Sequence, residues 1–100
     1  MKITIESPHI RISQKLEKQI HTKFAQLGKM YDRIVNCDVL LKKENDDKKK
    51  FYTVEARLVV PKALLFATEK EETFEIALDK LIDDLEHQLR RHKEELEEAR

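Results

Sequence analysis

The sequence predicts a small α+β domain with the element order β-α-β-β-β-α, a four-stranded sheet with both helices packed on one face. Three observations lead to this prediction. Apolar and polar residues alternate at the start of the chain and again through its middle, which is typical of half-buried strands. Two other segments, one on each side of that middle part, repeat apolar residues every three or four positions, as amphipathic helices do. One hundred residues are near the size at which a single core suffices, so we expect one domain over residues 1–100.

Boundary residues mark the opening strand and the first helix. Ile3 and Ile5 alternate with polar neighbours, and Pro8 ends this strand because it has no backbone N–H to donate. Ser13 is a suitable N-cap for the helix that follows. Gly28 costs a helix about 1 kcal/mol relative to Ala, so we expect a soft last turn. The apolar stripe of this helix consists of Leu16, Ile20, Phe24, Leu27 and Tyr31.

Three strands are expected in the middle of the chain, where the apolar period changes to two from Ile34 onward. A polar turn at residues 45–50 separates the first two, and a Pro61-Lys62 turn leads to a short third strand at residues 63–68. Turns this short predict an antiparallel meander. The inward-facing residues of the first two strands are Cys37, Val39 and Leu41, then Tyr52, Val54, Ala56, Leu58 and Val60.

The last helix begins near Phe74 and runs for about 26 residues at helical spacing. This is longer than the core of a small domain needs, so we expect its Glu-rich end to project. The helical crossover between the first two strands predicts that they are parallel and connected in the right-handed sense. Both helices must bury their stripes, most economically side by side on the sheet. The stripe of the last helix consists of Phe74, Leu78, Leu81, Leu85, Leu89, His92 and Leu96.

A formal net charge of +0 conceals a polarised molecule. Residues 71–100 contain eleven carboxylates and five Lys or Arg, whereas residues 11–33 contain six basic and two acidic side chains. Within the acidic segment, two helical turns hold a basic island, made of His87, Arg90, Arg91, His92 and Lys93. Like charges this close repel one another, so the clusters predict a polyanionic partner. The alternative is a solvated helix face held by salt bridges.

Several classes of function are disfavoured. Gly28 is the only glycine, so the chain has no Gly-rich loop for nucleotide phosphates. Cys37 is the only cysteine, which predicts a core residue and neither a disulfide nor a thiolate metal site. The carboxylates are spaced as solvated charges, so we expect no enzyme, no cofactor and no small-molecule substrate. No segment is long and apolar enough to be a signal peptide or a membrane span, which predicts a cytoplasmic protein without a membrane partner.

Several segments, in order and at matching spacings, resemble a known family over essentially the whole chain. They are Lys23-Phe24-Ala25, Met30-Tyr31-Asp32-Arg33-Ile34, Ala77-Leu78-Asp79 and Leu81 to Lys93. The chain is similar to the ribosome hibernation-promoting factors, also called ribosome-associated inhibitor A or sigma-54 modulation proteins. The resemblance implies the β-α-β-β-β-α fold. It also implies a stress or stationary-phase protein that binds the small ribosomal subunit in the channel for messenger and transfer RNA and blocks translation there.

The resemblance further implies that basic side chains of both helices contact ribosomal RNA. The candidate contact residues are Lys23, Lys29, Arg33, His87, Arg90, Arg91, His92 and Lys93. His92 also lies on the apolar stripe, where a packing role is the alternative. We expect no metal site, and we expect a monomer away from the ribosome.

The chain departs from the family pattern at four positions where a basic or aromatic residue is usual: Gln26, Glu75, Asp84 and His87. These departures predict weaker or more salt-sensitive ribosome binding, with contacts moved towards the first helix and Lys48-Lys49-Lys50. The chain resembles the short form, which lacks the C-terminal domain that pairs ribosomes. The alternative function is a protein-interaction module that uses the outer sheet face or the projecting acidic helix and does not bind RNA.

Overall fold

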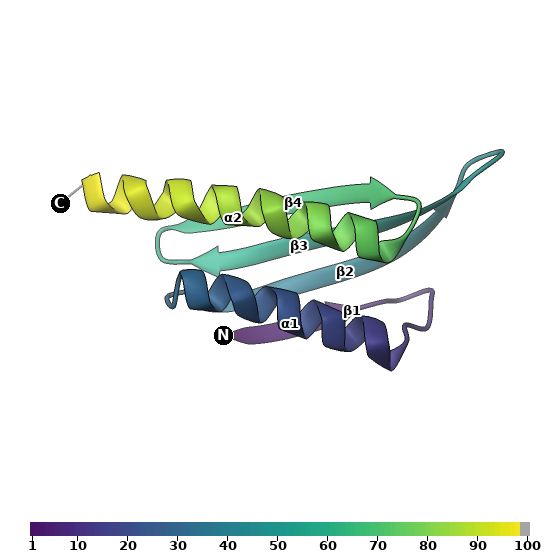
Figure 1. Cartoon of the computed structure of the whole chain (residues 1–100), viewed down its shortest axis with the longest axis horizontal. Coiled ribbons are helices and arrows are strands. Elements are labelled where there is room, and N and C mark those ends of the chain that lie inside the picture. The colour runs from purple at the N-terminus through teal and green to yellow at the C-terminus, as the bar shows by residue number, and fades with distance from the viewer. Residues whose placement is uncertain (99–100) are drawn as a thin grey trace.

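The computed structural model describes residues 1–98, and the predicted element order is confirmed (Figure 1). Four strands and two helices follow one another without a long loop. Their bounds are β1 (Lys2–Glu6), α1 (Gln14–Met30), β2 (Asn36–Asn45), β3 (Lys50–Val60), β4 (Ala63–Glu71) and α2 (Phe74–Glu98).

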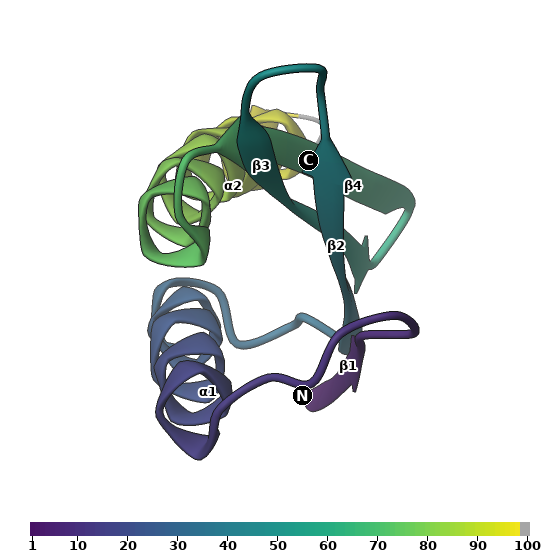
Figure 2. The same ribbon diagram turned by 90° about the vertical axis from the view of Figure 1, so that its right-hand side faces the viewer.

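The sheet has the spatial order β1-β2-β3-β4, with β1 parallel to β2 and the other neighbours antiparallel. Both helices cover the same face of the sheet, so the fold has two layers (Figure 2). The predicted α+β class, the parallel first pair and the placement of the helices are therefore confirmed. The strands that precede the two helices, β1 and β4, run in the same direction. The helices α1 and α2 therefore also run in the same direction, and their C-terminal parts lie at the same end of the molecule (Figure 1).

The core lies between the helices and the sheet. Most of each predicted stripe is buried, with Phe24, Ile20 and Leu27 of α1 fully enclosed. Phe74 and Leu96, at the two ends of the α2 stripe, are half-buried. The register places Cys37 opposite Leu58 and Val39 opposite Ala56, so the inward residues of β2 and β3 form adjacent rows. Burying each large apolar side chain contributes on the order of 1.5–3 kcal/mol before conformational entropy is subtracted.

Side-chain caps fix where both helices begin. Ser13 Oγ accepts a hydrogen bond of 3.0 Å from the Leu16 N–H, as predicted, and Thr73 Oγ1 accepts one of 3.1 Å from the Ile76 N–H. The first helix continues through Gly28 and is closed by a 2.9 Å bond from the Tyr31 N–H to the Leu27 carbonyl.

Cys37 is a core residue, as predicted, and its side chain is fully enclosed. Its thiol lies 3.3 Å from the Met1 sulfur, which covers it at the edge of the core. Burial, helped by the neighbouring Asp38 carboxylate, raises the pKa of the Cys37 thiol to about 12. The thiol therefore stays protonated at any physiological pH.

Two boundaries refine the sequence-based expectations. The strand β4 continues past Thr68 to Glu71, because β3 offers it partners as far as Tyr52. The C-terminal part of α2 extends past the neighbouring ends of the other elements, as predicted (Figure 1). No helix within residues 1–98 is long and apolar enough to cross a membrane.

Candidate nucleic-acid interface

A basic hollow lies at the end of the molecule where the two helices finish. Lys29 and Arg33 reach it from the C-terminus of α1 and the loop that follows, and Lys93 reaches it from α2. Its volume is about 380 Å³. The remaining lining residues are Met30, Tyr31, Asp32, Leu96 and Glu97. Lys93 therefore shares one surface with Lys29 and Arg33, from which it is distant in sequence.

The Tyr31 side chain gives this hollow an unused polar group. Its hydroxyl is buried and has no hydrogen-bond partner among the described residues. Buried polar atoms of this kind are normally satisfied by water or by a bound group. The hollow itself is lined by three cations and by the two acidic residues Asp32 and Glu97, so its lining is polar with a net positive charge.

The basic island of α2 divides between two sides of the helix. Asp79 forms a 2.6 Å ion pair with Lys23, so the side of α2 that carries Asp79 faces α1. Gln88 donates a 2.9 Å hydrogen bond to the Phe66 carbonyl, so the side that carries Gln88 faces β4. At about 100° per residue, Arg90 and Lys93 fall on the Asp79 side and Arg91 falls towards the Gln88 side. These three basic side chains are exposed. The island therefore spreads over the outward ridge of α2.

His92 differs from its neighbours because it belongs to the core. It is only 8% exposed, and its Nε2 lies 3.0 Å from the Pro61 carbonyl oxygen. Its ring also meets Tyr31 edge to face, with centroids 6.2 Å apart. The expectation of direct RNA contact does not fit this position, since the accessible part of the ring is too small. The structure favours the packing role.

Lys23 and His87 lie away from the hollow. Lys23 is paired with Asp79 across the two helices and its side chain is 36% exposed, so its charge is partly neutralised. His87 is exposed on the outward ridge of α2. Asp84, one of the departures from the family pattern, accepts a 3.1 Å hydrogen bond from Gln88 and so helps to hold α2 against β4. Its carboxylate therefore has a structural role here.

We call Lys29, Arg33, Arg90, Arg91 and Lys93 the proximal basic cluster. Among the side chains of residues 1–97, none of these five has a carboxylate within ion-pair distance. On α2, each of the three cluster residues has a glutamate four positions before or after it in the sequence. Exposed ion pairs at that spacing stabilise a helix by only about 0.2–0.5 kcal/mol. These glutamates are Glu86, Glu94, Glu95 and Glu97. The cluster remains free to bind an anion.

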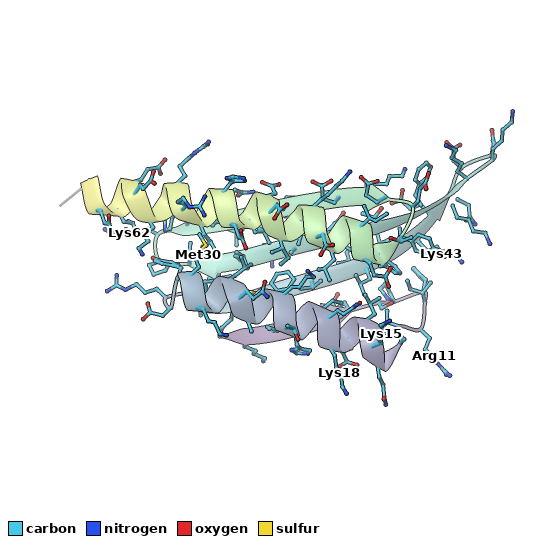
Figure 3. The ribbon with its side chains drawn as sticks, viewed as in Figure 1. Arg11, Lys15, Lys18, Met30, Lys43 and Lys62 are labelled. Atoms are coloured by element: carbon cyan, nitrogen blue, oxygen red, sulfur yellow. The ribbon has the colours of Figure 1, made fainter. Side chains whose placement is uncertain are left out.

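The turn between β3 and β4 adds Lys62, which the sequence did not single out. Lys62 is exposed and adopts a positive φ of 65°, which turns the chain tightly beside α2. Figure 3 shows Lys62 and Met30 at the same end of the molecule. The bond between Pro61 and His92 fixes this turn against the helix. A lysine in a two-residue turn gives no sequence signal of a site, and only the fold brings it near the cluster.

Carboxylate, imidazole and thiol groups are not arranged for metal binding in the described part of the chain. The surface at the proximal end consists of exposed cations around a hollow whose lining also includes Asp32 and Glu97. Such a surface can bind phosphates and position a large anion.

The comparisons with known proteins agree on one family. The family described as sigma 54 modulation protein / S30EA ribosomal protein matches residues 3–97. A protein of Pseudomonas putida named ribosome hibernation promoting factor is 33% identical over 94% of this chain and 88% of its own length. The protein of that name from Escherichia coli K12 is 33% identical over 98% of this chain and 99% of its own length.

Solved structures match the fold at lower sequence identity. A ribosomal subunit interface protein from Coxiella burnetii has a TM-score of 0.80 at 22% identity, covering 93% of this chain and 98% of its own. The N-terminal domain of Protein Y from Thermus thermophilus has a TM-score of 0.81 at 22% identity, covering 92% of this chain and 99% of its own. Both likenesses support the two-layer arrangement described above.

Proposed function

Since this chain belongs to the sigma 54 modulation protein / S30EA ribosomal protein family, we propose that it is a ribosome hibernation factor that inhibits translation. It binds the small ribosomal subunit through ribosomal RNA, in the channel used by messenger and transfer RNA. The proximal basic cluster makes the principal contacts. Bound there in the cytoplasm under stress or in stationary phase, it keeps idle ribosomes inactive and intact.

The single observation that carries this proposal is the unpaired state of the proximal basic cluster. Five exposed cations at one end of the molecule have no carboxylate within ion-pair distance among the described residues. Arginine and lysine side chains bind phosphate strongly, and each contact releases counterions from the RNA. Phosphate contacts position a protein on RNA without reading its sequence, which suits recognition of one shaped site on a ribosome.

In this proposal the inhibition results from occupancy. The two helices and the sheet form one rigid body that places the cluster against the RNA backbone, and the bulk of the domain then excludes messenger and transfer RNA. No chemical step is required. In a cell-free reaction, the protein should therefore inhibit in proportion to the ribosomes present, and excess messenger or initiator transfer RNA should relieve the inhibition. Inhibition far below the ribosome concentration would point to a reaction instead.

Sedimentation with small subunits at a series of salt concentrations tests the binding. Log affinity should fall linearly with log salt, with a slope of about 0.7–0.9 per phosphate contact, or roughly 4 for five contacts. Affinity that stayed flat from low to moderate salt would contradict the proposal.

A second candidate function rests on the outer face of the sheet. Leu64 and Phe66 of β4 are 56% and 51% exposed there, beside Val59 and Arg57 of β3. Exposed apolar side chains that lie together can mark a protein-binding surface. Salt-insensitive association with a partner protein, abolished by changes at these two residues, would favour this function over RNA binding.

A further inference from the structure

Four more basic residues gather at the end of the molecule opposite the proximal basic cluster. Arg11 precedes α1, Lys15 and Lys18 lie in its first turns, and Lys43 lies on β2 near the hairpin to β3. Figure 3 shows Arg11, Lys15, Lys18 and Lys43 towards this end, away from Met30 and Lys62. All four are exposed. We call them the distal basic cluster.

The cations of the distal basic cluster are also without carboxylate partners. Among the side chains of residues 1–97, none of the four lies within ion-pair distance of an acid. The Lys43 ammonium lies 5.8 Å from the centre of the Tyr52 ring, a cation–π distance. Glu17 is the one acidic residue in the first turn of α1. The cluster therefore keeps a net positive charge.

The position of Lys15, the second residue of α1, is unfavourable for the helix that carries it. The N-terminus of a helix bears a partial positive charge, so cations there destabilise it and anions stabilise it. The second helix follows this rule, with Glu75 in its first turn. Helix stability therefore does not explain Lys15 in the first turn of α1, and Lys18 follows in the second turn. A polyanion bound at this end would be attracted both by the lysines and by the partial positive charge of the helix N-terminus.

The two clusters are too far apart to act as one patch. The molecule measures 51 × 26 × 18 Å, and the clusters lie towards opposite ends of the long axis (Figure 3). Electrostatic screening at physiological salt acts over about 8 Å, so each cluster attracts its own counterions independently. Between them, the facing helix surfaces are partly neutralised by the Lys23–Asp79 pair.

The hairpin tip does not belong to the distal basic cluster. It carries Lys48, Lys49 and Lys50, but Asp46 and Asp47 lie on the same turn, where the Asp46 N–H donates to the Lys49 carbonyl at 2.8 Å. These carboxylates offset most of the charge of the tip.

We infer that the distal basic cluster is a second RNA-contacting surface, which lets one protein molecule hold two separate stretches of phosphate backbone at once. The inference rests on the proposed function and adds a partner contact to it. The proximal cluster fixes one end of the domain, and the distal cluster fixes its orientation along the RNA.

The test uses the full chain with Arg11→Gln, Lys15→Gln and Lys18→Gln. Glutamine has nearly the helix propensity of lysine, so α1 should persist. Binding to small subunits should weaken, and the slope of log affinity against log salt should fall by about 2 for three lost contacts. The melting temperature should stay the same or rise slightly, because cations have left the start of a helix. A merely structural role for these residues would instead lower it.

A matched control removes three charges from the outer sheet face, by Lys42→Gln, Arg57→Gln and Lys70→Gln. Its net charge equals that of the distal variant, but each replaced cation is paired with a carboxylate in the parent. It should bind with nearly the parent salt slope. Chemical probing adds a second readout, in which the parent protects two separate rRNA segments and the distal variant loses protection of one only.

Three results would overturn the inference. A distal variant with the affinity and slope of the parent would leave the proposed function standing and remove only the second contact. Equal weakening of the distal variant and the control would mean that binding follows net charge and not this cluster. A parent chain that fails to bind small subunits at any salt would remove the proposed function, and the inference with it.

Discussion

The outer sheet face and the proximal end both carry several cations, but those of the outer face are paired with carboxylates and those of the proximal end are not. On the outer face, Lys42 pairs with Glu55 at 3.3 Å, Arg57 with Asp38 at 3.7 Å and Lys70 with Glu44 at 3.1 Å. At the proximal end, five cations have no such partner among the described residues. The net charge of zero therefore conceals a neutralised surface and a positive one, whose charge is balanced by carboxylates elsewhere, among them those of residues 71–100.

The register of the strands explains the first surface. Asp38 lies directly opposite Arg57, and Glu55 lies opposite Leu40, diagonal to Lys42. Charges on neighbouring strands at these positions are close enough to pair. On α2 the basic residues instead follow one another within a single turn, where each side chain points in its own direction. The difference teaches that local geometry decides which charges are available to a partner.

The largest effect is expected from reversing the proximal charges. Arg90→Glu, Arg91→Glu and Lys93→Glu together should lower affinity for small subunits on the order of 100-fold, because three phosphate contacts become repulsions. The fold should be unaffected, since all three side chains are exposed. Sedimentation with small subunits measures the first quantity, and thermal unfolding measures the second.

The next prediction tests whether the outer sheet face also contributes to binding the small subunit. Leu64→Ser with Phe66→Ser changes the apolar pair of that face and leaves every cation in place. This double variant should bind small subunits as the parent does. Loss of association in the double variant, with binding retained in the reversed-charge variant, would move the interface to the sheet.

The second largest effect is expected on stability, from replacing His92, the buried member of the basic island. His92→Ala removes the hydrogen bond to the Pro61 carbonyl and the edge contact with Tyr31. We expect a loss of stability of about 2 kcal/mol, which lowers the melting temperature by roughly 10 °C. The salt slope of ribosome binding should not change at temperatures where the variant is folded. A reduced slope in a fully stable variant would instead make His92 an RNA contact.

A smaller gain is expected from adding a cation to the outward ridge. His87→Arg places a permanent charge at an exposed position between the two sides of α2. One added phosphate contact should raise affinity about threefold at low salt and increase the salt slope by less than one unit. Asp84→Lys is less suitable alone, because it removes the acceptor of the Gln88 hydrogen bond. An unchanged affinity and salt slope in His87→Arg would show that this ridge faces away from the RNA.

The smallest effect is expected for the contribution of the ion pairs on the outer sheet face to the free energy of unfolding. A double-mutant cycle of Lys42→Gln and Glu55→Gln should give a coupling energy of a few tenths of a kcal/mol, since exposed ion pairs contribute about 0–1 kcal/mol. Urea unfolding of the four proteins measures it. A coupling above roughly 1 kcal/mol would mean that these pairs hold the sheet together, beyond neutralising its surface.

Much of the fold could be predicted from the sequence because its signals are local. The two helical stripes, the alternation in β2 and β3 and the Ser13 cap all depend on near neighbours, and each is present in the structure. The end of β4 was less predictable, since Glu71 is held in the strand by its partner Tyr52 on β3. That pairing depends on register, which a single segment does not encode.

The site was predictable in its residue types but not in its grouping. The sequence marked Lys29, Arg33 and Lys93 as basic, and the parallel run of the helices brings them to one hollow. It gave no sign that Lys23 is paired with Asp79, nor that Lys62 lies at the same end. These relations depend on how two helices and a turn meet, so they appear only in three dimensions.

The enclosed thiol of Cys37 gives this protein a built-in reporter of its own breathing motions. A thiol with a pKa of about 12, covered by Met1, has almost no thiolate to react with alkylating reagents while the domain is closed. Its labelling rate therefore counts the moments when β2 opens at its N-terminal end. Ribosome binding that damps those openings would slow the labelling. The effect of the partner on the core could then be followed at a native residue, without introducing a cysteine by mutation.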